Sequence, residues 1–107
     1  MKLTTRVALA GAADTASFLS MRRDLFTTSP ARAYGSVAFG GLWATLAVKS
    51  LIDGDHSDNA TLGLALALAA ANGVMLAVHL RNHVTNPRVF AGAALSAVAL
   101  ADTLRRR

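Results

Sequence analysis

Residues 60–80 decide the fold of this chain: they read ATLGLALALAAANGVMLAVHL and include no Asp, Glu, Lys or Arg. At a rise of about 1.5 Å per residue, a helix of this length can cross a bilayer core of ~30 Å. The stretch therefore predicts a transmembrane helix. It makes the protein a membrane-protein candidate before any motif is considered.

Around this segment, three more apolar stretches alternate with short polar ones, and they cover residues 3–21, 33–52 and 89–104. Pro30 and Pro87 each stand just ahead of an apolar stretch, where a helix start tolerates proline. No stretch alternates apolar and polar residues with a period of two, so strands are not expected. We therefore expect one domain over residues 1–107, an all-α integral membrane bundle of four transmembrane helices.

Composition agrees with a membrane location. Hydrophobic residues make up 53% of the chain and charged residues only 16%, against about 25% charged residues in a soluble domain. The net charge is +5, and the basic residues cluster at the ends of the apolar stretches. We therefore expect a lipid bilayer with anionic headgroups as the partner, not nucleic acid, and a bacterial inner (plasma) membrane as the location.

The absence of cysteine excludes disulfides, thiolate metal sites and a cysteine nucleophile. The N-terminal apolar run is broken by Arg6 and Asp14. We therefore interpret it as part of the mature chain and not as a signal peptide.

The charges between the apolar stretches predict an orientation. The first and third connections are basic, whereas the second is acidic, so the positive-inside rule places the first and third in the cytoplasm. Four spans would then leave both termini outside, which conflicts with the basic residues 105–107. Segments 3–21 and 89–104 lying in the interface would resolve the conflict. We favour four crossings, because segment 89–104 has no polar face for water.

Small residues recur at every fourth position in the last two apolar stretches. Such spacing lets helix backbones approach closely in lipid and predicts a tight bundle or a homo-oligomer. The three repeats are Gly63-Ala67-Ala71, Ala69-Gly73-Ala77 and Ala93-Ala97-Ala101.

Asp14 is the first candidate for a functional residue. On a helical wheel it falls beside Val7 and Phe18, on the most apolar face of its segment. An ionised carboxylate near mid-bilayer costs about 2.5–3.5 kcal/mol on insertion scales. Asp14 should therefore face the bundle interior and either pair with a partner such as Arg6 or stay protonated. Its candidate roles are a protonatable ligand site and a catalytic acid or base.

Asn72 and Trp43 are the other ligand-binding candidates. Asn72 lies in the middle of its span, where an amide can bridge helices or orient a ligand, and bridging is the favoured role. Trp43 supplies an amphipathic ring within segment 33–52. Asp102, close to Arg105 and Arg106, is expected to form ion pairs at the interface instead of acting in a site.

His79 and His83 are weak metal-ligand candidates. On one continuous helix, imidazoles four residues apart would face the same way and could bind Zn, Cu or haem iron. The spacing resembles one histidine box of membrane di-iron desaturases and hydroxylases, which need several boxes, whereas this chain has only His56 besides. We therefore expect no metal and no cofactor, with both histidines near lipid phosphates.

Asp53, Asp55 and Asp58 are interpreted as a solvated acidic turn. An EF-hand calcium loop needs a central glycine and a terminal Glu, whereas Gly54 is misplaced and the chain contains no Glu.

The chain length and the predicted span count resemble those of the small multidrug resistance transporters. That family has four helices and an essential acid in the first, and Asp14 would be the matching position. The family uses Glu in a Trp- and Tyr-rich context that this chain lacks. The resemblance therefore concerns architecture.

Three functions remain open at this point. The first is transport or binding of a small lipophilic or cationic ligand, with Asp14 as the intramembrane acid. The second is a membrane-embedded enzyme that uses Asp14 for acid/base chemistry on a lipophilic substrate. The third is a non-catalytic accessory subunit of a membrane complex. A cavity lined by Asp14 and Asn72 would favour the first two, and a solid Ala/Gly seam would favour the third.

Overall fold

The computed structural model describes Met1–Arg107 and contains helices but no strands. The elements in chain order are α1 (Leu3–Met21), α2 (Leu25–Thr28), α3 (Pro30–Ile52), α4 (Asn59–Arg81) and α5 (Pro87–Arg105). The four long helices coincide with the predicted apolar stretches to within three residues at each end. The one-turn α2 lies in the first connection, where no helix is predicted.

Three of the four long helices, α3, α4 and α5, are long and apolar enough to cross a membrane. Helix α1 does not belong to this set, so four spans are not confirmed. The physical reason is its composition, because Arg6, Asp14 and five hydroxyl side chains dilute the apolar residues of its 19-residue length. The chain is thus helical with three candidate membrane spans.

The helix starts follow the local sequence. Pro30 and Pro87 are the first residues of α3 and α5, where a missing N–H costs no hydrogen bond. Asp58 caps α4, since its side chain accepts a hydrogen bond from the Thr61 N–H at 2.9 Å.

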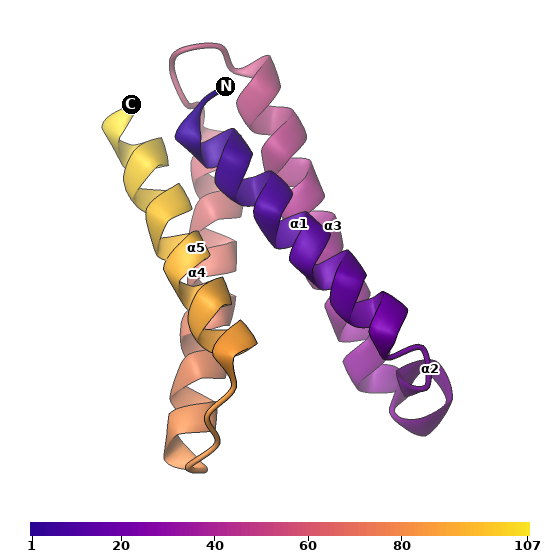
Figure 1. Cartoon of the computed structure of the whole chain (residues 1–107). Helices are drawn as coiled ribbons and strands as arrows, with labels where there is room; N and C mark the ends of the chain where they lie inside the picture. The colour runs from indigo at the N-terminus through magenta and orange to yellow at the C-terminus, as the bar shows by residue number, and fades with distance from the viewer.

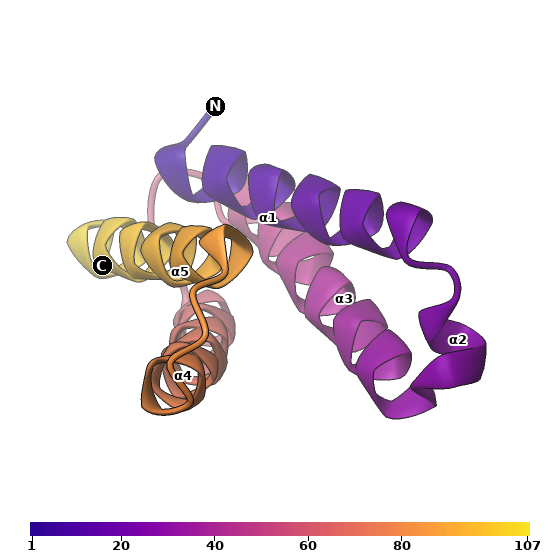
Figure 2. The ribbon, with the colours of Figure 1, turned by 60° about the horizontal axis from the view of Figure 1, so that its bottom comes forward.

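The long helices run alternately up and down (Figure 1). Both chain termini and the α3–α4 turn lie at one end, the upper end in Figure 1, and the other two connections lie at the lower end. Helix α1 packs mainly on α3, α5 packs on α4, and α1 also contacts α5. Figure 2 shows α3 and α4 diverging from their shared turn. The bundle is therefore closed at its upper end and splayed at its lower end.

The hydrophobic core occupies the region where the four helices converge. Its buried members are Val7, Ala8, Trp43, Leu46, Ala47, Leu68 and Ala99. A Cβ atom on Gly11 would overlap the indole ring of Trp43, so only glycine lets that ring lie against α1.

The predicted small-residue repeats do not form the packing seam within the chain. Most of their members are exposed, namely Gly63, Ala67, Gly73, Ala77, Ala97 and Ala101. A Cβ atom on Gly63 or Gly73 would meet no other atom within 4 Å. The helices instead approach through other small residues such as Ala8, Gly11 and Ala99, and homo-oligomerisation through the repeats stays a prediction.

A polar network fastens the upper end. The Asp102 carboxylate accepts hydrogen bonds from the backbone N–H and the hydroxyl of Thr4, at 3.0 and 2.6 Å. It also pairs with Arg105 at 2.5 Å and Arg106 at 3.0 Å. The predicted ion pairing of Asp102 is confirmed. Its position at the N-terminus of α1, where the helix dipole favours an anion, was not apparent from sequence.

Candidate functional site

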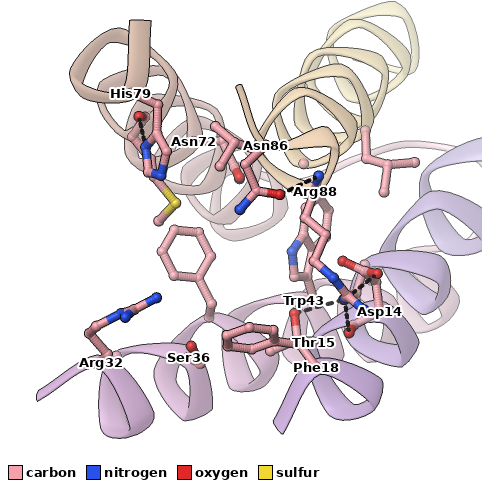
Figure 3. A pocket seen from close by; sticks show the side chains of 17 residues that line it. Asp14, Thr15, Phe18, Arg32, Ser36, Trp43, Asn72, His79, Asn86 and Arg88 are labelled. Carbon is pink, nitrogen blue, oxygen red and sulfur yellow. Dashed lines mark hydrogen bonds and ion pairs between the residues drawn. The ribbon is translucent and has the colours of Figure 1, made fainter. Parts of the chain in front are cut away.

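A cavity of about 500 Å³ lies between the lower halves of α1, α3, α4 and α5 (Figure 3). Its apolar wall consists of Phe18, Phe39, Trp43, Met75, Val89 and Leu95. Its polar side chains are Asp14, Thr15, Arg32, Ser36, Asn72, His79, Asn86 and Arg88. The cavity therefore combines an aromatic and aliphatic wall with an extensive polar and charged side.

Small side chains and helix divergence together create this space. Gly35 on α3 borders the cavity, and a Cβ atom there would meet nothing within 4 Å. The chain that follows α4 climbs back before α5 begins, so α5 leaves the lower end of α4 uncovered (Figure 1). Side chains of α3 and α4 consequently border an opening instead of packing on each other.

Asp14 faces the cavity and is paired. Its Oδ1 lies 2.9 Å from Nη1 of Arg88, which also donates to the Asp14 backbone carbonyl at 3.3 Å. The Arg88 guanidinium carbon is 5.5 Å from the centroid of the Phe18 ring, within the range of a cation–π contact. The expectation that Asp14 pairs with a basic residue is met, but Arg6 is the wrong partner. Arg6 lies near the upper end of α1 and is exposed.

Asn72 is buried at the upper limit of the cavity. Its amide nitrogen donates to the Leu68 carbonyl at 2.8 Å, one turn earlier in the same helix. The predicted hydrogen bond between helices is therefore absent. Asn72 meets α5 by steric contact, because its Oδ1 lies 2.6 Å from where a Gly92 Cβ would stand. No protein donor bonds to this oxygen.

Trp43 forms the apolar end of the cavity and belongs to the buried core at the same time. Asp14, Asn72 and Trp43, the three predicted ligand-binding residues, thus line one cavity. Their roles in binding stay predictions.

His79 lines the cavity but His83 does not. Helix α4 ends at Arg81, and His83 has a backbone φ of 57°, so the two imidazoles do not share a helical face. The Nδ1 of His79 lies 2.8 Å from the Met75 carbonyl, to which it can only donate. No group of three or more His, Cys, Asp or Glu side chains is arranged to hold a metal ion.

Two arginines of the cavity were missed by the sequence reasoning, which treated Arg32 and Arg88 as loop charges. Each lies within the first turn of its helix, one or two residues after the initial proline. Because proline marks the first residue of each helix, the sequence could have placed both arginines on helices instead of in loops. Both arginines lie in the same half of the bundle as Asp14.

The acidic turn between α3 and α4 is a separate feature of the upper end. Burial acts to raise the pKa of Asp53, but the Thr61 hydroxyl and Lys49 hold it below its ordinary value. The hydrogen bond from Lys49, at 2.6 Å, and that from the Thr61 N–H lower the pKa of Asp58 further. These carboxylates fasten the turn to α3 and α4. The prediction of a solvated turn is therefore incomplete, because the Asp53 side chain is 3% exposed.

Comparisons with known proteins give no parallel. No protein-family model matches the chain, and neither a curated protein nor a solved structure is significantly similar to it.

Proposed function

We propose that this chain is an integral membrane protein that binds or transports a lipophilic ligand in the cavity between its four long helices. The observation that carries the proposal is the cavity itself. Its volume of about 500 Å³ falls within the ~300–1,000 Å³ of small-molecule sites, and aromatic side chains line it beside polar and charged ones.

Four membrane crossings in a bacterial inner membrane fit this proposal. Helix α1 runs beside α3 over most of its length (Figure 1), and three of its polar side chains have partners, although the exposed Arg6 has none. Thr5 bonds Ser50 at 2.7 Å, Thr15 bonds the Gly11 carbonyl at 2.9 Å, and Asp14 is ion-paired. Polar residues that pair inside a bundle are compatible with a span, because the cost of burying them in lipid is offset.

A lipophilic ligand would reach the cavity from the bilayer. The lower halves of α3 and α4 diverge (Figure 2), and side chains of both helices line the cavity, so we propose entry between them. We propose that the lower end, with its basic connections, faces the cytoplasm. The chain has no native cysteine, so single cysteines at Ser57 and Asn82 should react with membrane-impermeant reagents from opposite sides.

The geometry supports binding over the two alternatives. An enzyme that used Asp14 for proton transfer would need a free carboxylate, and here Oδ1 faces Arg88 at 2.9 Å. An accessory subunit that only packed against partners would not need a cavity lined by aromatic and charged groups.

Trp43 provides the test, because it is the only tryptophan, it borders the cavity, and its side chain is shielded from the surrounding lipid. Bromine atoms quench indole fluorescence on contact. Brominated single-chain lipophiles, added to the protein in nanodiscs, should therefore quench Trp43 in a saturable manner. A reporter variant with Trp43→Phe and Val74→Trp, where Val74 is 64% exposed, should show only the unsaturable quenching of a lipid-facing ring.

A pair of matched variants links the signal to the cavity. Gly35→Leu fills the cavity, whereas Gly73→Leu adds the same side chain at an equally open position that does not border it. Both changes raise helix propensity by a similar amount, about 0.8–1 kcal/mol. Gly35→Leu should abolish saturable quenching and Gly73→Leu should keep it. Equal quenching in both variants, or none in the unchanged protein, would refute the proposal.

A further inference from the structure

We propose that the ligand of this cavity is an anionic single-chain amphiphile. Its oxyanion headgroup, a carboxylate or a phosphate, would lie at Arg32 on the lower rim, and its apolar chain would extend toward Trp43. This inference rests on the proposed function, since it names the chemical class that the same cavity accepts.

The charges around the cavity favour an anion. Asp14 and Arg88 neutralise each other at 2.9 Å. Arg32 is the remaining charged residue of the lining, and its side chain makes no hydrogen bond or ion pair. The acid that senses its charge, Asp24, is already paired with Arg22 at 3.1 Å. The cavity lining therefore carries one positive charge without a direct partner. A ligand carboxylate or phosphate would complement it, because arginine binds such groups through paired N–H donors.

The placement of these groups fits a ligand that enters from one side. Figure 3 shows Arg32 of α3 and His79 of α4 together on one side of the cavity, and Asp14 with Arg88 on the other. The side with Arg32 and His79 is where α3 and α4 diverge (Figure 2). An oxyanion arriving there meets the free guanidinium of Arg32 first.

The size of the cavity limits the ligand to one chain. A water molecule in the liquid occupies ~30 Å³. If each non-hydrogen atom of the ligand needs the same space, the volume of about 500 Å³ holds roughly 15 to 20 such atoms. That number matches one alkyl chain of a fatty acid or an alkyl phosphate with its headgroup at the rim, not the two chains of a phospholipid. The deep wall of Phe39, Trp43 and Leu95 offers the apolar contact that such a chain needs.

A cationic ligand is less compatible with this arrangement. It would need the Asp14 carboxylate, and it would therefore have to displace Arg88 and leave that guanidinium without its partner. It would also lie in the same cavity as the unpaired Arg32. Both effects oppose binding of a second cation.

The experiment measures headgroup preference through Trp43. Protein in nanodiscs is first saturated with 9,10-dibromostearate, and recovery of fluorescence is followed as unlabelled competitors displace it. Oleate, oleyl phosphate, oleyl alcohol and oleylamine share one chain and differ in the headgroup. Oleate and oleyl phosphate should compete about tenfold better than the alcohol, the difference expected for one charged hydrogen bond at a partly solvated site. The amine should compete worst.

Two variants that each remove one positive charge test where the headgroup binds. Arg32→Gln should weaken oleate competition about tenfold and leave oleyl alcohol unchanged. Arg23→Gln removes a positive charge at the same end of the bundle, but outside the cavity, and should leave both unchanged. Asp14→Asn frees Arg88 and should preserve or strengthen oleate competition.

The outcomes separate this inference from the proposed function. If no brominated compound of any headgroup quenches Trp43 saturably, the cavity does not bind lipophiles and both proposals fail. If neutral or cationic compounds bind as well as oleate does, or if Arg32→Gln and Arg23→Gln behave alike, the anionic class alone is overturned. Loss of oleate binding in a folded Asp14→Asn variant would overturn it too.

Discussion

The two ends of the bundle use the same residue type in opposite ways. At the upper end, the Asp102 side chain is 1% exposed and bonds Thr4 of α1 and the two arginines at the end of α5, Arg105 and Arg106. At the lower end, the Asp14 side chain is 49% exposed and has one partner from another helix, Arg88. Asp14–Arg88 is also the only side-chain ion pair that joins two long helices at that end, where Arg88 lies over the Phe18 ring as well.

This difference separates stability from binding within a small chain. The upper end is closed by a buried carboxylate, a hydroxyl pair and the fastened turn, so it resists opening. The lower end has one partly exposed ion pair and one cation–π contact between α1 and α5, so its helices can separate at lower cost. Binding regions are drawn from the less stable parts of proteins, because they must admit a ligand.

The largest expected effect comes from Asp102→Asn. The change removes the charge that two arginines and the α1 N-terminus share, and breaking a buried ion pair costs about 3–5 kcal/mol. Because Arg105 is 69% exposed and can find water, we expect the lower value, about 3 kcal/mol. Equilibrium unfolding in mixed micelles, followed by circular dichroism, measures it.

Asp55→Asn is the matched control, because Asp55 lies at the same end, is exposed and makes no ion pair. It should change stability by less than about 0.5 kcal/mol, as expected for an exposed residue away from such features. Equal effects of the two variants would mean that the upper network does not hold the bundle together.

The next effect concerns the contact between Gly11 and Trp43, which lies between the upper end and the cavity. Gly11→Ala places a methyl group where the Trp43 ring lies, and overpacking of this kind costs about 1–3 kcal/mol. We expect lower stability and a red-shifted Trp43 emission, since the ring must move toward the cavity. Gly63→Ala, at an open helical position, should instead stabilise the protein slightly. Unchanged emission in Gly11→Ala would contradict the packing described here.

Sequence reasoning found the elements but reversed the two aspartates. The apolar stretches predicted the four long helices because hydrophobicity and Pro30 and Pro87 are local properties. Asp14 was expected to be the desolvated acid because its helical face is apolar. That face borders a cavity instead, because of the path that α5 takes, and local sequence does not show this path.

The reverse holds for Asp102. Its place near a helix end predicted ion pairs at the membrane interface, and nothing local shows that the N-terminus of α1 lies beside it. The same limit applies to Arg32 and Arg88, which enter the site through the splay of the helices. Residue types identified Asp14, Asn72 and Trp43 as site candidates, but the charge of the site depends on tertiary structure.

A smaller effect is expected from breaking the lower pair. Asp14→Ala should lower stability by no more than about 1 kcal/mol, because half-exposed ion pairs contribute little. A double-mutant cycle with Arg88→Met isolates the pair from other losses. A coupling as large as the effect of Asp102→Asn would show that the lower end is as firmly closed as the upper one.

The smallest effect is local and concerns pH at the acidic turn. The folded pKa values of Asp53 and Asp58 are depressed, so their contribution to stability is complete above the ordinary aspartate value of about 3.9 and is lost as pH falls through the folded values. The amide resonance of Thr61, whose N–H donates to Asp58, should therefore stay constant from pH 7 down to about 4 and move only below it. In Asp58→Asn that response should be strongly reduced. A Thr61 transition centred above pH 5 would mean that Lys49 and Thr61 do not hold these carboxylates in the ionised form, and the turn would then be as loosely held as the lower end.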